Sequence, residues 1–213
     1  LRTGPIATPQ YGNTQDVAAR HWLTGRGLRV DQDVDVIPMK GADQLALFKR
    51  GDLKAAWTVE PWVSRIVAEA GGRVVLDERE LWKDGKFAST VILVNARFLR
   101  ERPDVVKAWL RAHVELTRRI LERPEDARKD LNRELARVAG RPLPDAILAD
   151  ALSRITPTWD PLAATLAVNA RRAFQQGFLG KEEPDQSGFF ELGLLNEVLA
   201  EAGLSPVPPA PGR

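Results

Sequence analysis

The stretch from Pro5 to Ala18 reads PIATPQYGNTQDVA and decides the fold. Its apolar beginning, Pro5 to Pro9, predicts a short strand that runs into a turn at Gly12. Asn13 is a good N-cap residue, and Asp16 stands three positions later, as in a capping box. The stretch therefore predicts a strand, a glycine turn and a helix in direct succession.

The same alternation continues downstream of this stretch. Helices are expected from Ala42 to Phe48, ended by Gly51, and from Pro61 to Gly71. Further strands are expected at Val34–Pro38, Ala55–Val59 and Arg73–Leu76. Strands that alternate with helices at this spacing predict a parallel sheet covered on both faces.

The pattern changes after about Glu78. One more apolar strand is expected at Thr90–Val94, and the rest is helical. Helices are expected to begin near Pro103, Pro124, Pro144 and Pro161, and a last one spans Leu194–Ala202. The proline-rich tail from Ser205 to Arg213 is expected to be disordered. The late helices and the isolated strand either pack on the first sheet or belong to a second lobe whose other strands precede Leu1.

Composition excludes several classes of function. The chain has no cysteine, so disulfides and thiolate chemistry are absent. Its 31 basic and 29 acidic residues are interleaved, which predicts a solvated surface without affinity for nucleic acid. His21 and His113 lie in separate amphipathic helices, and no nucleophile elbow, phosphate loop or metal-ligand spacing is present. We therefore expect a protein that is not an enzyme and that needs no metal or cofactor.

The first candidate site follows the first predicted strand. In an open α/β sheet, ligands lie beyond the carboxyl ends of the strands, where helices begin. Exposed backbone N–H groups at such a helix start favour an anion. The candidate binding residues here are Gln10, Gly12, Asn13, Thr14 and Gln15. In the alternative interpretation Asn13 is only a helix cap and Gln10 only a surface residue.

The second candidate site follows the third predicted strand, at the same edge of the sheet. Trp57 could form the wall of a pocket there, and Glu60 could accept a hydrogen bond from an ammonium group. In the alternative interpretation Glu60 caps the helix that begins at Pro61, and Trp57 belongs to the core.

The chain resembles the periplasmic component of nitrate, sulfonate and taurine ABC importers, the aliphatic-sulfonate-binding-like proteins. The resemblance rests on four segments in the family's order. These are residues 6–18; residues 45–52 with 55–57 and 60–62; residues 98–99 with 103–108; and Phe190 with residues 194–196. It extends over nearly the whole chain.

The resemblance implies an α/β fold of the type II periplasmic-binding-protein kind. One parallel-sheet lobe, residues 4–86, is expected to be complete, and residues 87–204 would form the crossing strand and helical part of the other lobe, followed by the tail 205–213. By the family's pattern the Gly12–Gln15 turn would hold an anion, and Trp57–Glu60 would face the rest of the ligand.

The partners implied by the resemblance are a small anionic ligand, such as a sulfonate, taurine or nitrate, and the permease of an ABC importer. The protein would be a monomer in the periplasm or outside the cell, lipid-anchored or free. A signal sequence and the opening strands of the first lobe, which family members have, are missing from residues 1–213.

Two rival interpretations share this architecture. One is the effector-binding domain of a LysR-type transcription regulator, although the long helical part after Val94 speaks against it. The other is a synthase of thiamine-precursor biosynthesis, whose cysteine-rich motif and histidine are not found here.

Overall fold

The computed structural model describes residues 4–209, which form two compact units. The first unit runs to Gly85 and also contains Leu143–Ile155 and Ala167–Pro184. The second contains Lys86–Pro142, Thr156–Leu166 and the chain from Asp185 onward.

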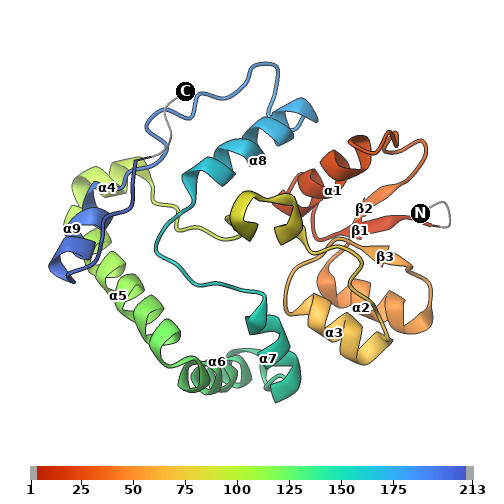
Figure 1. Cartoon of the computed structure of the whole chain (residues 1–213), viewed down its shortest axis with the longest axis horizontal. Coiled ribbons are helices and arrows are strands. Elements are labelled where there is room, and N and C mark those ends of the chain that lie inside the picture. Colours follow the sequence, from red (N-terminus) through yellow and green to blue (C-terminus); the bar gives the residue numbers. More distant parts are fainter. Residues whose placement is uncertain (1–3, 210–213) are drawn as a thin grey trace. The chain divides into compact units, whose positions relative to one another are not determined.

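The first unit is built on a parallel sheet of three strands in the order β2-β1-β3. The strands are β1 (Ile6–Thr8), β2 (Val36–Pro38) and β3 (Ala55–Ala56). Helices α1 (Thr14–Thr24) and α2 (Gly41–Arg50) connect them, and α3 (Trp62–Ala70) follows. Figure 1 shows α1 on one side of the strands and α2 and α3 on the other. This is the predicted α/β arrangement, with β1 at the centre and all three of its residues buried.

Local sequence signals account for the ends of these helices. Gly51 and Gly71 end α2 and α3 in the left-handed conformation, with φ of 79° and 66°. Glycine takes this conformation without the steric penalty of a Cβ atom. The predicted helix ends at these two residues are confirmed.

Two predicted strands are wrong. Neither Arg73–Leu76 nor Thr90–Val94 forms a strand. Their apolar side chains are largely exposed, with 85% of Val75 and 79% of Leu93 accessible. A run of β-branched residues becomes a strand only where a neighbouring strand offers a hydrogen-bonding ladder, and within residues 4–209 these two segments have none.

Parts of the chain's second half complete the first unit. Two short 3₁₀ helices, η1 (Glu78–Leu81) and η2 (Lys83–Gly85), precede its boundary at Gly85. Helix α7 (Asp145–Ser153) packs against α3, and most of α8 (Ala163–Gln175) belongs to this unit. These units differ from the predicted division into residues 4–86 and 87–204. Two segments that come later in the chain, Leu143–Ile155 and Ala167–Pro184, belong to the unit that contains the sheet.

The second unit is helical in its described part. It contains α4 (Ala96–Glu101), α5 (Pro103–Glu122), α6 (Pro124–Ala139) and α9 (Gly193–Glu201). Pro103 and Pro124 occupy the first positions of their helices, as predicted, because the missing N–H would be unpaired there.

The core of the second unit lies between α5 and α9. Val114, Leu195, Val198 and Leu199 are buried together with Val207. The prediction of a disordered tail is wrong at Val207, because two hydrogen bonds with the side chain of Asn196 hold its backbone, at 2.8 and 3.1 Å. Residues 210–213 of the predicted tail lie outside the described residues.

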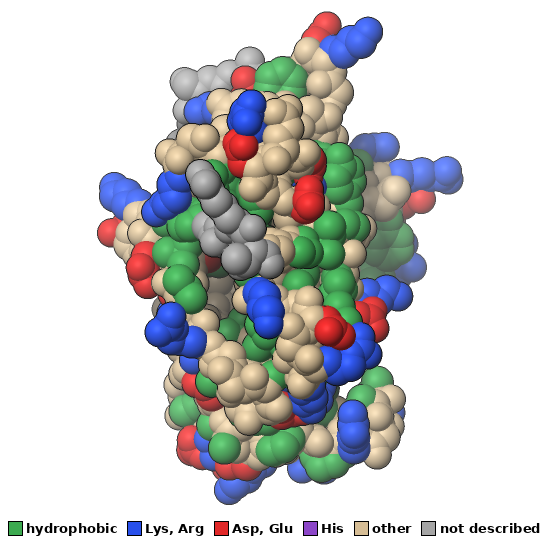
Figure 2. All heavy atoms as spheres, turned by 90° about the vertical axis from the view of Figure 1, so that its right-hand side faces the viewer, with side chains coloured by type: hydrophobic (Ala, Val, Ile, Leu, Met, Phe, Trp, Pro, Cys, Tyr) green, Lys and Arg blue, Asp and Glu red, His purple; other side chains and the backbone are tan. Residues whose placement is uncertain are grey.

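Basic and acidic side chains are interspersed on the face shown in Figure 2. On that face they alternate without a large area of one sign (Figure 2). In the second unit, surface ion pairs such as Arg119–Asp130 and Arg137–Glu134 balance charge locally. Among residues 4–209, no helix is both long and apolar enough to cross a membrane.

Candidate functional site

The two predicted sites follow strands that end at the same edge of the sheet. Strand β1 ends at Thr8 and its parallel neighbour β3 ends at Ala56, with Ala7 opposite Ala56. Because parallel strands share one carboxyl edge, the turn at Gly12 and the segment from Trp57 to Glu60 both follow from it. The expected common edge is confirmed by the strand register.

The turn after β1 requires glycine at position 12. Gly12 has a left-handed φ of 72°, and a Cβ atom there would lie 3.1 Å from the ring of Phe178. The backbone of this turn therefore lies directly against a side chain that follows α8. The sequence predicts a close approach at Gly12, but it does not predict that Phe178 makes it.

The start of α1 leaves two backbone donors open. Asn13 caps the helix, and its Oδ1 accepts the N–H of Asp16 at 2.9 Å. The N–H of Asn13 reaches the carbonyl oxygen of Gln10 at 3.3 Å. Among the residues that the structure describes, the amides of Thr14 and Gln15 have no protein acceptor. These are the two N–H groups at the start of α1 that could donate hydrogen bonds to an anion.

Three of the predicted site residues, Gln10, Asn13 and Gln15, make hydrogen bonds within the turn itself. Asn13 donates from Nδ2 to the Oε1 of Gln15 at 3.2 Å, so the cap also fixes the buried Gln15 side chain. Gln10 contributes its backbone carbonyl. Thr14 is half-buried, and no hydrogen bond of its hydroxyl is found within residues 4–209.

Asp16 holds the turn through hydrogen bonds to its carboxylate, whereas the sequence indicated it only as part of a helix cap. Its fully buried carboxylate accepts the Thr8 hydroxyl at 2.8 Å, the Gly12 N–H at 2.9 Å and Arg20 Nε at 3.0 Å. The Gly12 amide is therefore engaged within the protein. The i, i+4 spacing of Asp16 and Arg20 was the signal that could have indicated this buried pair.

Trp57 has the contacts of a core residue. Its ring packs edge-to-face on Trp22, with 5.9 Å between the centroids, inside the cluster that α1 forms against the sheet. Its indole Nε1 donates to the carboxylate of Glu78 at 2.8 Å. This geometry is that of the alternative interpretation, in which the tryptophan stabilises the fold.

Glu78 is a partly buried carboxylate that was not among the predicted site residues. It also accepts the indole N–H of Trp82 at 3.3 Å. Burial raises the pKa of Glu78 above its ordinary value, while the two indole donors and Arg172 oppose this rise. The Arg172 guanidinium lies over the ring of Trp82, 4.5 Å from its centroid.

Glu60 is also engaged within the protein. Its carboxylate accepts the backbone N–H and the hydroxyl of Ser64 at 3.1 and 2.8 Å. Arg154, the residue that follows α7, binds the other oxygen at 2.9 Å, and the Glu60 side chain is only 7% exposed. These contacts are those of a helix cap with a buried ion pair, and they leave little room for a ligand amine at this carboxylate.

No metal-binding cluster is found in the described chain. Within residues 4–209, no group of three or more histidine, aspartate or glutamate side chains could hold a metal ion. Partial burial and the positive charge of Arg172 lower the pKa of His21.

The fold is that of the type II periplasmic binding proteins. The structure superimposes on the periplasmic aliphatic sulphonate binding protein of Escherichia coli with a TM-score of 0.66 and 21% sequence identity. The match covers 86% of this chain and 57% of that protein.

The chain belongs to the NMT1-like family, whose model matches residues 3–137. It is also similar to a nitrate/nitrite binding protein of Nostoc, with 28% identity over 49% of this chain and 23% of that protein. The taurine-binding periplasmic protein of Escherichia coli is 26% identical over 64% of this chain and 41% of its own length. The chain thus spans less than two thirds of each of these relatives.

Proposed function

We propose that this protein is a solute-binding protein that captures a small organic anion and delivers it to an ABC importer. The observation that supports it is the pair of unengaged amides at Thr14 and Gln15, at the start of α1 beyond the central strand. The N–H groups at a helix start carry a partial positive charge and suit a sulfonate, nitrate or carboxylate. The names of the relatives point to ligands of the same chemistry.

The proposed anion site consists of Gly12 to Gln15. Asp16 engages the Gly12 amide, so the donors to the ligand would be the amides of Thr14 and Gln15, with the Thr14 hydroxyl beside them. The proposal extends to the setting that the relatives' names suggest: the periplasm or cell exterior, with the permease of an importer as the partner. Closure around the ligand would present the bound form to that permease.

The sharpest test replaces Thr14 by proline. Thr14 is the first residue of α1, a position that accepts proline, and Asn13 before it is extended (φ −76°, ψ 174°), as a residue preceding proline must be. Thr14→Pro therefore removes one N–H and the hydroxyl while the helix is kept. Thr14→Ala is the matched control, because it removes the hydroxyl alone.

The assay is calorimetric titration with ethanesulfonate, taurine and nitrate, and with uncharged ethyl methyl sulfone as a comparison ligand. We expect at least one anion to bind and Thr14→Pro to weaken it at least about tenfold, or about 1.4 kcal/mol. Thr14→Ala should lose less than Thr14→Pro. Equal affinity of the proline variant and the wild type, or equal binding of the sulfone, would contradict the proposal.

A further inference from the structure

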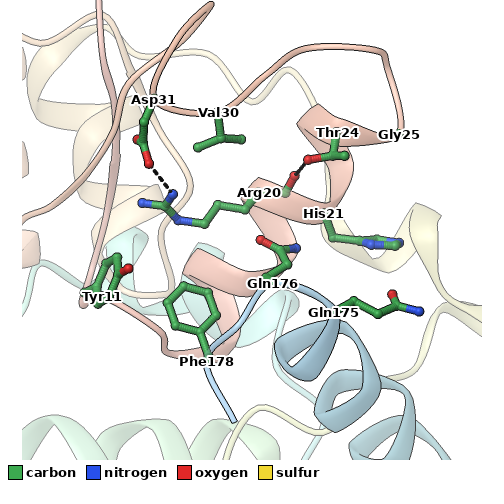
Figure 3. A pocket seen from close by; sticks show the side chains of 10 residues that line it. All are labelled: Tyr11, Arg20, His21, Thr24, Gly25, Val30, Asp31, Gln175, Gln176 and Phe178. Carbon is green, nitrogen blue, oxygen red and sulfur yellow. Dashed lines mark hydrogen bonds and ion pairs between the residues drawn. The ribbon is translucent and has the colours of Figure 1, made fainter. Parts of the chain in front are cut away.

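A cavity of about 570 Å³ lies in the first unit, next to the turn at Gly12, because Tyr11 and Phe178 belong to its lining. Figure 3 shows it between the second half of α1, the loop before β2 and the end of α8. Neither Thr14 nor Gln15 lines it. Its volume falls within the range of sites for small molecules.

Arg20 and Asp31 are the charged residues of the cavity lining, and Arg20 also pairs with Asp16, which does not line it. Arg20 is held by Asp16 through Nε, by Asp31 through Nη1 and by the carbonyl of Val36 through Nη2. Its charge is matched by the fully buried Asp16 at 3.0 Å. Asp31 is therefore the second carboxylate on a single guanidinium, and one negative charge is not balanced within this group.

Asp31 is placed so that it can bind a ligand. Its backbone has a left-handed φ of 63°, which is uncommon for a residue other than glycine. Only its Oδ2 bonds Arg20, and 61% of the side chain is exposed. In Figure 3 the carboxylate lies opposite Tyr11 and Phe178 across the Arg20 guanidinium. The free Oδ1 is thus available to a cationic group.

The remaining walls suit an organic cation. Tyr11 is 63% exposed and packs edge-to-face against Phe178, with 5.0 Å between ring centroids. One face of Tyr11 already receives a cation, because the Arg20 guanidinium lies 5.3 Å from its centroid. Gln176 donates from Nε2 to the carbonyl of Val17, which leaves its Oε1 as a further acceptor. Aromatic faces with nearby oxygen acceptors are what ammonium groups prefer.

We propose that this cavity is a second binding site, which takes a small organic ammonium ion bearing an apolar or aromatic group. Asp31 Oδ1 accepts a hydrogen bond from the ammonium group, and Gln176 Oε1 provides another acceptor. Tyr11 and Phe178 contact the apolar part. The proposed anion donors at Thr14 and Gln15 do not line this cavity, and the second site does not depend on the function proposed above.

Three probes of similar shape test the charge requirement: 2-phenylethylammonium, 2-phenylethanol and phenylacetate. Their binding is measured by ¹H–¹⁵N NMR titration, with the amides of Gly25, Asp31 and Gln176 as reporters. We expect the cation to shift these amides with a dissociation constant at least tenfold lower than that of the alcohol or the carboxylate. Equal binding of the alcohol, or no shift of the reporters with the cation, would overturn the proposal.

Asp31→Asn tests the carboxylate without disturbing its backbone, because asparagine tolerates the left-handed conformation. Asp35→Asn is the matched control: it makes the same change of charge in the same loop, and Asp35 does not line the cavity. The first variant should weaken the ammonium probe at least tenfold and the second less than twofold. If Asp31→Asn binds like the wild type, or if both variants lose affinity equally, the assignment fails.

The two sites can be distinguished in the same samples. Asp31→Asn should leave the affinity for ethanesulfonate unchanged, and Thr14→Pro should leave the affinity for 2-phenylethylammonium unchanged. Loss of both ligands in either variant would contradict the separation of the sites. Loss of anion binding alone, in Thr14→Pro, would support both assignments.

Discussion

Replacing Asp16 by asparagine should destabilise the first unit more than any conservative surface change. The carboxylate is fully buried and accepts three donors, Thr8 Oγ1, the Gly12 N–H and Arg20 Nε, at 2.8–3.0 Å. An asparagine keeps the shape, but its NH₂ group must face at least one of these donors. It also removes the fully buried partner of Arg20, whose side chain is only 9% exposed.

The size of the loss follows from the partners that remain. Removing one member of a buried ion pair costs about 3–5 kcal/mol. Arg20 keeps Asp31 and the Val36 carbonyl, so the lower end applies, about 3 kcal/mol. This is a large part of the roughly 5–15 kcal/mol by which domains are stable.

Hydrogen exchange of the α1 amides measures this loss within the first unit, without assuming that the whole chain unfolds in one step. Asp16→Asn should lower their free energy of opening by about 3 kcal/mol. The double variant with Arg20→Gln should recover at least about 1 kcal/mol of the summed losses, as expected for coupled neighbours. A loss below about 1 kcal/mol, or strict additivity, would refute the reasoning.

Two further predictions concern the stability of each unit. Because burial raises the folded pKa of Glu78, its charge costs stability at neutral pH, and the cost is relieved as the pH falls through that pKa. In urea titrations the wild type should therefore gain stability relative to Glu78→Gln between pH 7 and pH 4.5, and a constant difference would contradict this. Asn196→Ala should cost about 1–3 kcal/mol, because it removes both hydrogen bonds to Val207. Exchange of the Val207 amide should then be at least tenfold faster, and unchanged exchange would show that the tail is held otherwise.

Local chemistry made much of the fold predictable. The Asn13 cap and the glycines at 51 and 71 act within a few residues, so their effect can be recognised without tertiary information. The Arg73–Leu76 and Thr90–Val94 predictions failed for the opposite reason. A strand depends on a partner elsewhere, and an apolar run cannot show by itself whether that partner exists.

The candidate site was predictable to a similar extent. The glycine turn and the open helix start follow from the order of residues around Gly12. The engagement of Glu60 by Arg154 could not be predicted, because 94 residues separate the two side chains. Likewise, no local pattern shows that Trp57 packs against Trp22 and donates a hydrogen bond to Glu78.

The most direct test of the anion site is the response of individual amides. In a ¹H–¹⁵N NMR titration with ethanesulfonate, taurine or nitrate, the resonances of Thr14 and Gln15 should move together and saturate at the same ligand concentration. If an anion binds while both of these resonances stay in place, the amides at the start of α1 are not its donors, and the account of the site is wrong.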